Sequence, residues 1–393
     1  MKKTIARLTG LLLAAMMATT GCGGEQPSGE VGNTPTGDTV KIGWIGPLTG
    51  DNAVWGACER DTLQMLVDEQ NEKGGLMDKK IELVAYDTKG DATEAVNAVK
   101  RLTSQDKVVA ILGPNSSGQA LSISGILEQT HVPDIATVAT NPKVTVGDDG
   151  KVKPYNFRIC FIDPYQGAVA AGYAADKLGF KSAALLYDVT SDYSQGLTEF
   201  FEKNFTEKGG KVVAKEGFKA GDVDFRAQLS KIKEANPDVI FMPYFYKEVA
   251  LSANQARELG ITATMMGGDG WPSDQLIEMA KDAIDGSYVV NHLDFNDPEV
   301  QPLQEQYKAK YNKNLEINGY LVHDAFQLFQ AAAGKAGSLN SAAIAKAIPE
   351  VELKGITGNI RISSETHNPE GKEAAIIMIK DGNYEFREKY AAN

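Results

Sequence analysis

The sequence predicts an α/β protein with two Rossmann-like lobes, each built on a parallel sheet, joined by a hinge of several strands. From Val40 onward, short apolar runs alternate with segments whose apolar residues recur at helical spacing. This alternation is typical of parallel sheets covered by helices on both faces. The same order returns in the second half of the chain, which indicates two lobes of similar topology.

The chain begins with the pattern of a secretory leader. Basic residues precede an apolar run over residues 8–18, and Thr19-Thr20-Gly21-Cys22 follows. This layout predicts a signal peptide over residues 1–22 and export, because the run is shorter than the ~18 residues of a membrane span. The end resembles a bacterial lipobox, with Thr19 where that pattern favours Leu. We expect Cys22 to carry a lipid; ordinary leader cleavage nearby is the alternative.

The segment after the leader has the composition of a tether. Residues 23–39 contain Gly, Pro, Ser, Thr and acidic residues with almost nothing apolar, which predicts a flexible segment. The rest of the 393-residue chain is long enough for two lobes. The net charge of −12 argues against nucleic acid as a partner, since an acidic surface repels phosphates.

The elements of the first half follow from hydrophobic spacing and turn residues. Four short apolar runs predict strands over residues 40–45, 81–86, 108–112 and 135–139. Between the first two runs, Leu63, Leu66 and Val67 show helical spacing, and two glycines end that helix. Asp91 and Glu94 predict the capped start of the next helix.

The second half repeats this order and then returns to the first lobe. Apolar runs predict strands over residues 183–187, 212–214 and 239–242. Lys-Gly-Gly ends corresponding helices at residues 73–75 and 208–210, each time before a strand. After Asn291, helices are expected over residues 301–311 and 323–333, and strands over residues 358–362 and 374–379. These late segments indicate that the chain crosses back between the lobes.

The resulting partition gives each lobe two stretches of chain. Residues 40–161 and 292–370 are assigned to the first lobe, and residues 162–291 and 371–393 to the second.

Cys58 and Cys160 lie far apart in sequence. They could pair in an exported protein, but we expect both to be free and buried, because a chain of this length needs no disulfide.

Signatures of catalysis are missing from the sequence. The four histidines, His131, His292, His323 and His367, have no metal-ligand spacing. There is no Gly-x-Ser-x-Gly motif and no phosphate-binding loop of the Gly-x4-Gly-Lys-Ser/Thr type. We therefore expect no metal, no cofactor and no enzymatic activity.

Two loops after predicted strands of the first half are candidate binding loops, because ligands of α/β sheets bind beyond the carboxyl ends of strands. Ser116 and Ser117 open a helix, where hydroxyls and free amides suit a carboxylate. A plain N-cap is the alternative for either serine. Val138, Ala139 and Thr140 form the second loop, which offers a carbonyl and a hydroxyl; a plain turn is the alternative there.

The second half contributes a carboxylate and aromatic residues. Asp269 lies among glycines after an apolar run and could pair with an ammonium group, although such a residue is often a solvated turn residue. Aromatic residues that occur in the same loops are candidates for pocket walls, with a core role as the alternative: Trp55, Tyr193, Phe245, Tyr246 and Tyr320.

Taken in order along the chain, these motifs resemble one family. They are Ile-Gly-Trp-Ile-Gly-Pro-Leu-Thr-Gly (42–50), Ile-Leu-Gly-Pro-Asn-Ser-Ser (111–117), Ala-Thr-Asn-Pro (139–142), Phe-Arg-Ile-Cys (157–160), Gln166-Gly167, Tyr187-Asp188 and Gly-Asp-Gly-Trp (268–271). The chain resembles the leucine/isoleucine/valine-binding protein family, the type I solute-binding proteins of branched-chain amino-acid ABC importers. The resemblance covers residues 40–386.

The resemblance implies roles for individual residues. Ser116 or Ser117 with Thr140 would bind a carboxylate, and the Val138 carbonyl, next to Ala139, and Asp269 would take an ammonium group. Tyr193 would come from the closing lobe, while Trp55 and Tyr246 would form aromatic walls. Asp269 is shorter than the Glu of the family's leucine binder.

The resemblance also implies a way of working. A monomer, tethered at the periplasmic or outer surface by a lipid on Cys22, would close its lobes on an amino acid and deliver it to a membrane permease. Alternatives are a pocket for an amide, urea or an aromatic carboxylate, and a tethered sensor in place of an importer component. An exported enzyme is the third alternative.

Overall fold

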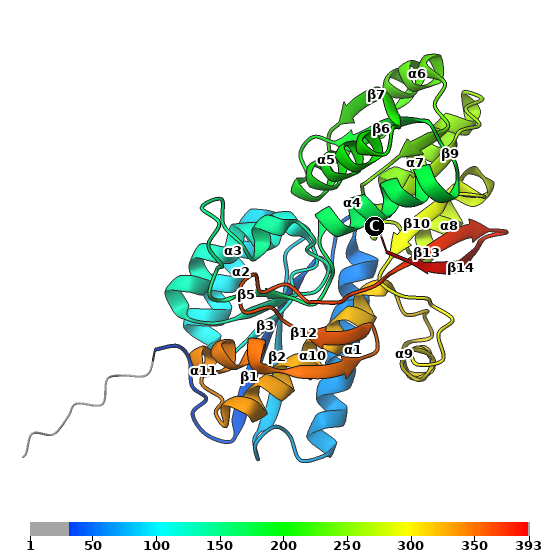
Figure 1. Ribbon diagram of the computed structural model, residues 1–393. Coiled ribbons are helices and arrows are strands. Elements are labelled where there is room, and N and C mark those ends of the chain that lie inside the picture. Colours follow the sequence, from blue (N-terminus) through cyan, green and yellow to red (C-terminus); the bar gives the residue numbers. More distant parts are fainter. Residues whose placement is uncertain (1–30, 392–393) are drawn as a thin grey trace, which may run out of the picture. The chain divides into compact units, whose positions relative to one another are not determined.

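The computed structural model describes residues 31–391 (Figure 1). The expected leader, Cys22 and the first part of the expected tether lie outside the described residues. Within residues 31–391, no helix combines the length and the apolar character that crossing a membrane requires. The described residues form two large sheets with helices around them and one two-stranded sheet, so the fold class expected from the sequence is confirmed.

The first sheet has five parallel strands in the order β2-β1-β3-β4-β5. Its strands are β1 (Thr39–Gly46), β2 (Lys80–Asp87), β3 (Ile111–Leu112), β4 (Asp134–Ala136) and β5 (Asn156–Arg158). The helices that follow its first strands are α1 (Ala53–Glu72), α2 (Ala92–Arg101), which continues into a π turn at Leu102–Asp106, and α3 (Ser117–Thr130). The late helices α9 (Gln301–Tyr311), α10 (Ile317–Ala336) and α11 (Ser341–Ala347) complete this lobe, and α10 packs along α1.

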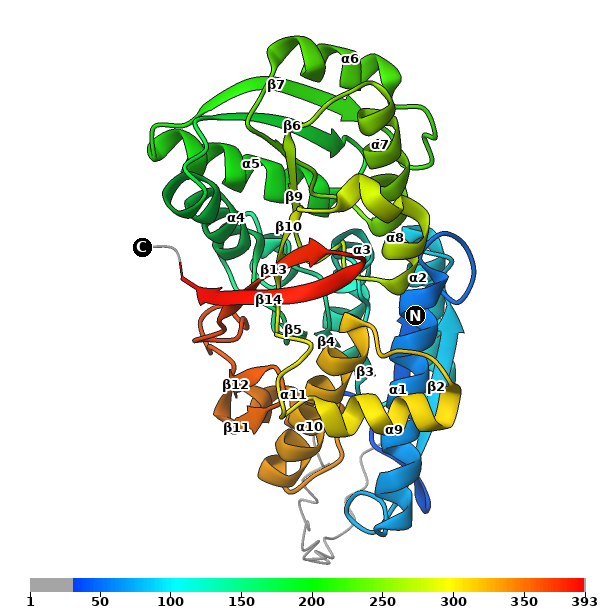
Figure 2. The ribbon, with the colours of Figure 1, turned by 90° about the vertical axis from the view of Figure 1, so that its right-hand side faces the viewer.

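The second sheet has seven strands in the order β14-β13-β10-β9-β8-β6-β7. Its parallel part consists of β6 (Ser182–Asp188), β7 (Lys211–Phe218), β8 (Val239–Phe241), β9 (Thr264–Gly267) and β10 (Tyr288–Asn291). Its helices are α4 (Asp163–Gly172), α5 (Asp192–Glu207), α6 (Arg226–Ala235), α7 (Tyr246–Glu258) and α8 (Asp274–Ala280). An antiparallel pair, β13 (Ala374–Lys380) and β14 (Asn383–Tyr390), extends this sheet at one edge (Figure 2).

The chain passes between the two sheets three times. It leaves the first sheet after β5, returns to the first lobe after β10, and leaves again after the hairpin of β11 (Glu352–Gly355) and β12 (Gly358–Arg361). These three connections form the multi-strand hinge expected from the late segments of the sequence.

The helix stops predicted at the two Lys-Gly-Gly sequences are confirmed. The last residues of α1 and α5 directly precede these sequences. Gly75 has a φ of +81°, and a Cβ there would lie 2.0 Å from the Lys79 carbonyl oxygen. Gly209 has a φ of +84°. A residue with a side chain would be strained at either position, which explains why glycine ends these helices.

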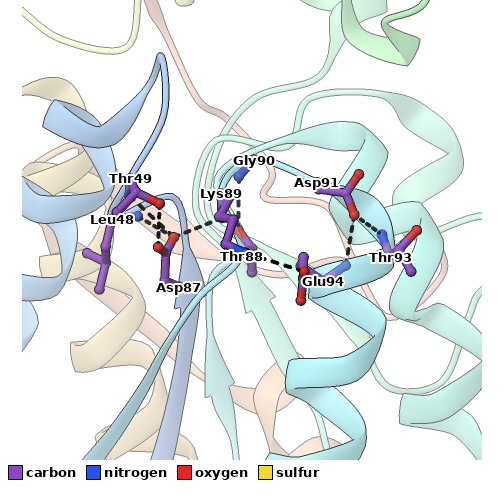
Figure 3. A network of polar contacts seen from close by, with 9 residues as sticks. All are labelled: Leu48, Thr49, Asp87, Thr88, Lys89, Gly90, Asp91, Thr93 and Glu94. Carbon is purple, nitrogen blue, oxygen red and sulfur yellow. Dashed lines mark hydrogen bonds and ion pairs between the residues drawn. The ribbon is translucent and has the colours of Figure 1, made fainter.

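The predicted start of α2 is confirmed, with one difference in detail (Figure 3). The Asp91 carboxylate accepts hydrogen bonds from the amides of Thr93 and Glu94, at 2.8 and 2.9 Å, and so caps the helix. Glu94 does not bond back to the Asp91 amide, which donates to Thr88. It forms an ion pair with Lys89 at 3.6 Å instead.

Some predicted elements differ in extent. The strand expected over residues 108–112 is only Ile111–Leu112, although Val109 already donates to the Lys41 carbonyl of β1 at 2.9 Å. The helix expected over residues 323–333 is the central part of the longer α10. The described end of the expected tether contacts the first lobe, since the Asn33 side chain donates to the carbonyls of Thr103 and Val108 at 2.9 Å each.

Both described cysteines are free and buried, as expected. Burial raises the pKa of the Cys58 thiol to about 12, and the same cause raises the pKa of Cys160 to about 12. The two thiols therefore stay protonated and act as small apolar side chains.

Candidate functional site

Seven of the eleven residues singled out in the sequence line one small cavity between loops of the two lobes. They are Trp55, Ser116, Ser117, Val138, Tyr193, Phe245 and Asp269, and the cavity is completed by Asn115, Gly270 and Asn318. Tyr320 lines a separate pocket. Within the small cavity, the space open to the centres of water molecules is about 10 Å³. An adjoining open cavity of about 500 Å³ shares Ser116, Ser117, Tyr193 and Phe245 with it and leads outward. The site is thus a closed chamber with a wider mouth.

The serine loop supplies hydroxyls and a helix N-terminus. Ser116 is the N-cap of α3, in extended conformation, and its side chain makes no capping hydrogen bond. Ser117 is 1% exposed, and its hydroxyl oxygen accepts from the Asn141 amide at 3.1 Å. Both hydroxyls can still donate, and α3 directs unpaired amides to the same place. This arrangement suits a carboxylate.

The loop after β4 contributes fewer residues to the cavity than the sequence indicated. Val138 lines the cavity, but Ala139 and Thr140 do not. The Ala139 carbonyl accepts from Arg158 Nη1 at 2.6 Å, and the Asn141 carbonyl of the same loop accepts from Nη2 at 2.8 Å. Thr140 lies beside Asp163, whose pKa is raised to about 8 by burial, with a smaller contribution from the charge of Asp269.

Asp269 is a buried carboxylate with two neutral neighbours. It is 1% exposed and accepts hydrogen bonds from Gln166 Nε2 and from His292 Nε2, at 3.0 Å each. Burial lowers the pKa of His292, although Asp269 opposes this shift, so the imidazole is neutral at pH 7. The two neighbours orient the carboxylate without neutralising its charge. A buried charge of this kind favours a cationic partner.

Aromatic rings form one side of the cavity. The rings of Tyr193 and Phe245 are stacked, with centroids 5.5 Å apart and planes 6° apart. The Tyr193 hydroxyl accepts from the Gly270 amide at 3.2 Å, which ties α5 to the loop of Asp269. Trp55 meets Phe245 edge-on at 5.5 Å. Tyr246 does not line the cavity; it packs behind Trp55 at 5.0 Å and supports it.

Three lining residues were outside the candidate set. Asn115 and Gly270 lie inside the motifs over residues 111–117 and 268–271, next to the candidate residues Ser116 and Asp269. Asn318 comes from α10, where an asparagine between Ile317 and Gly319 gave no signal of its own. Phe245 was among the candidate aromatics. Only the three-dimensional packing of α10 against α1 brings Asn318 to the site.

A buried carboxyl lies behind the first-lobe wall. Glu59 of α1 is fully buried and accepts from Asn115 Nδ2 at 2.9 Å and from the Thr137 hydroxyl at 2.6 Å. Burial raises its pKa to about 7, against the effect of these hydrogen bonds. Glu59 therefore ties α1 to both binding loops of the first sheet.

The two lobes contact each other at the mouth. The Tyr246 hydroxyl donates to the Asp51 carbonyl at 2.6 Å, and Lys247 forms an ion pair with the Asp51 carboxylate. On another side, Asn141 Nδ2 donates to the Asp192 carbonyl at 2.9 Å. These contacts hold the lobes together around the cavity.

The loop that carries Asp51 is itself fixed by a neighbouring network (Figure 3). The Asp87 carboxylate accepts from the amides of Leu48 and Lys89, at 2.8 Å each, and from the Thr49 hydroxyl at 2.6 Å. Burial opposes ionisation of Asp87, but these hydrogen bonds outweigh it and lower its pKa. The mouth thus has a rigid first-lobe rim.

No group of three or more His, Cys, Asp and Glu side chains within residues 31–391 is arranged to hold a metal ion. The site offers hydroxyls, amides, one carboxylate and aromatic rings, which is the chemistry of recognition.

The chain is similar in sequence and structure to proteins that bind solutes. It matches the family described as periplasmic binding protein over residues 39–383. It is 30% identical to the leucine-, isoleucine-, valine-, threonine-, and alanine-binding protein of Pseudomonas aeruginosa over 92% of each chain.

Two solved structures share the fold over nearly their whole length. The leucine binding protein LivK of Thermotoga maritima has 35% identity and a TM-score of 0.83, over 90% of this chain and 99% of that one. The substrate binding protein LivJ of Streptococcus pneumoniae, in complex with isoleucine, has 31% identity with the same TM-score and coverage. With its two parallel-sheet lobes and three hinge connections, this chain belongs to the periplasmic binding protein family and has the type I fold.

Proposed function

We propose that the protein captures an α-amino acid between its lobes and delivers it to the membrane permease of an ABC importer. One observation carries the proposal: the cavity places the hydroxyls of Ser116 and Ser117, at the start of α3, and the Asp269 carboxylate in one closed space. The first set suits a carboxylate and the second an ammonium group. An α-amino acid carries both groups on one carbon atom.

Because the site is buried, the carboxylate and the ammonium group of the solute each need a partner in the protein. Taking a charged group out of water costs several kcal/mol unless preorganised partners replace the water. Asp269 is held by Gln166 and His292, so it meets an ammonium group with little reorganisation. A solute with only one of the two charges would leave the other partner unpaired. This argument favours an amino acid over an aromatic carboxylate, which would leave Asp269 uncompensated.

The relatives support the same class of solute. The Pseudomonas aeruginosa relative is named for binding leucine, isoleucine, valine, threonine and alanine, and the Streptococcus pneumoniae structure contains isoleucine. We take amino acids with short side chains as the candidates for this chain.

A thermal-shift screen of purified protein against all amino acids and simple carboxylates tests the proposal. A ligand at a hundred times its Kd adds about 2.7 kcal/mol of stability, so a true solute should be evident. The proposal would be contradicted if benzoate or another carboxylate without an ammonium group stabilised the protein while no amino acid did.

We also propose that Cys22 carries a lipid and holds the protein at the membrane, near the permease. Labelling of cells with an alkyne fatty acid should mark the wild-type protein and not the Cys22→Ala variant. Release of wild-type protein without label would contradict the anchor and leave solute binding untouched.

A further inference from the structure

The wall that α10 gives to the cavity is an amide and not an apolar side chain. Asn318 is 1% exposed, and neither its Oδ1 nor its Nδ2 has a partner at hydrogen-bond geometry among the described residues. Its amide is near enough to Glu59 to lower the pKa of that carboxyl, against the larger effect of burial. Buried amides are normally paired, so this side chain has unused capacity to donate and to accept.

A second amide on the same wall has a fixed orientation. Asn115 Nδ2 donates to Glu59 Oε2 at 2.9 Å. In this arrangement the amide nitrogen of Asn115 faces Glu59, so the nitrogen is used within the wall. The Oδ1 atom of Asn115 is then its remaining acceptor, and the residue lines the cavity. The first-lobe wall therefore presents two asparagines beside the apolar side chains of Trp55 and Val138.

These amides penalise a purely aliphatic side chain. Covering a buried polar group without pairing it costs about 1–3 kcal/mol, whereas a hydrogen-bonding side chain would pair it. Sites built on hydrogen bonds reject analogues that lack the polar group much more strongly than apolar pockets reject a missing methyl group.

We propose that Asn115 and Asn318 form a side-chain subsite for an amino acid whose short side chain both donates and accepts hydrogen bonds, a hydroxyl or a carboxamide. Such a ligand is preferred over an aliphatic one of the same size. This inference rests on the proposed function, because it assumes that Ser116, Ser117 and Asp269 hold the α-carboxylate and the ammonium group.

Calorimetry with pairs of ligands of equal size tests the subsite. The protein is unfolded and refolded to remove bound ligand, then titrated with threonine against valine and with asparagine against leucine. We expect the polar member of at least one pair to bind tenfold or more tighter than its aliphatic partner. In the Asn318→Leu variant, which keeps the side-chain size, this ratio should fall to near one or invert. The Asn359→Leu variant, changed at an exposed site on β12, should keep the wild-type ratio.

The outcomes separate this inference from the proposed function. If valine and leucine bind as tightly as threonine and asparagine, or if Asn318→Leu keeps the wild-type ratio, the subsite is wrong and amino-acid binding stands. If no amino acid binds, the proposed function fails and the subsite fails with it. The wild-type ratios decide the question even if Asn318→Leu does not fold.

Discussion

At the scale of single residues, Asp269 shows how a buried charge is kept available. A carboxylate that is 1% exposed would ordinarily be neutralised by a cationic neighbour or protonated. Here its two hydrogen-bond partners are an amide and a neutral imidazole, neither of which carries a positive charge. A cation that enters the cavity would supply the missing positive charge.

We therefore expect Asp269→Asn to weaken amino-acid binding by on the order of 100-fold, because breaking a buried ion pair costs about 2–5 kcal/mol. Isothermal calorimetry gives the affinity, and the melting temperature of the ligand-free protein should stay at or above the wild-type value, since a buried charge is removed. Glu278→Gln removes one charge from an exposed position on α8 and should bind as the wild type does. Equal affinities of both variants would exclude Asp269 as the ammonium partner.

At the scale of elements, α1 links the fold to the site. It carries Trp55 and Glu59, and it approaches the loop after β1 so closely that a Cβ on Gly56 would lie 1.8 Å from the Pro47 carbonyl oxygen. That atom belongs to the backbone, so it cannot rotate away as the end of a side chain would. Either the helix or the loop must move if Gly56 gains a side chain.

The Gly56→Ala variant should accordingly lose about 1–3 kcal/mol of unfolding free energy, the usual cost of overpacking, and should bind its solute more weakly because Trp55 shifts. Denaturant unfolding measures the loss of stability, and calorimetry measures the weaker binding.

Gly125 is the matched control, since it is an exposed glycine inside α3 with open space around its Cβ position. Gly125→Ala should gain roughly 0.5–1 kcal/mol from helix propensity. A neutral Gly56→Ala would show that the contact relaxes without cost.

Elements also show what the sequence could and could not predict. Strong local signals, such as the glycines after α1 and α5 and the apolar run of β6, fixed their elements closely. The strand β14 was missed, because Asn383–Tyr390 is mostly polar and half-buried and pairs only at a sheet edge. Its identity as a strand depends on β13, a tertiary contact that no local pattern contains.

The residues of the site also include some that the sequence could predict and some that it could not. Loop residues after strands were predictable, because the rule for α/β sheets names them without a structure. Ala139 and Thr140 were expected to line the cavity and do not, since the conformation of their loop depends on the buried Arg158. Asn318 depends on how α10 packs, and Glu59 lies behind the wall. Neither could be found from spacing along the chain.

At the scale of the whole molecule, the lobes meet at the mouth through hydrogen bonds and through the packing of Trp55 on Phe245 and Tyr246. A single hydrogen bond there should affect release of the solute. The Tyr246 hydroxyl donates to the Asp51 carbonyl across the mouth. In Tyr246→Phe the ring that supports Trp55 remains, and one bond worth about 0.5–1.5 kcal/mol is lost from the closed form only.

The dissociation rate of Tyr246→Phe should therefore rise about 2–10-fold with little change in association, as seen by stopped-flow tryptophan fluorescence. Tyr187→Phe is the control, because the Tyr187 hydroxyl makes no hydrogen bond among the described residues and lies on β6. Equal dissociation rates in the two variants would mean that this bond does not hold the closed form.

Buried carboxyl groups with raised pKa values should make the unfolding free energy of the protein depend on pH. Glu316, at the start of α10, accepts from the Ser273 hydroxyl and the Asp274 amide of the other lobe, at 3.3 and 3.4 Å. Burial, with added repulsion from Asp274, raises its pKa to about 8. Glu59 and Asp163 are raised in the same direction, to about 7 and about 8.

A raised pKa means that the folded state binds the proton more tightly than the unfolded state, whose carboxyls titrate near pH 4–4.5. The contribution of these groups is complete below that range and is lost as the pH rises towards 8, so the unfolding free energy should fall between pH 5 and pH 8.5. Glu316→Gln cannot titrate, and over the same interval it should lose less stability than the wild type, by about 1 kcal/mol or more. Denaturant unfolding at several pH values measures both slopes, with Glu278→Gln as the exposed control that keeps the wild-type slope. Parallel curves for the wild type and Glu316→Gln would show that Glu316 ionises at an ordinary pH and that the contact between the lobes does not depend on its proton.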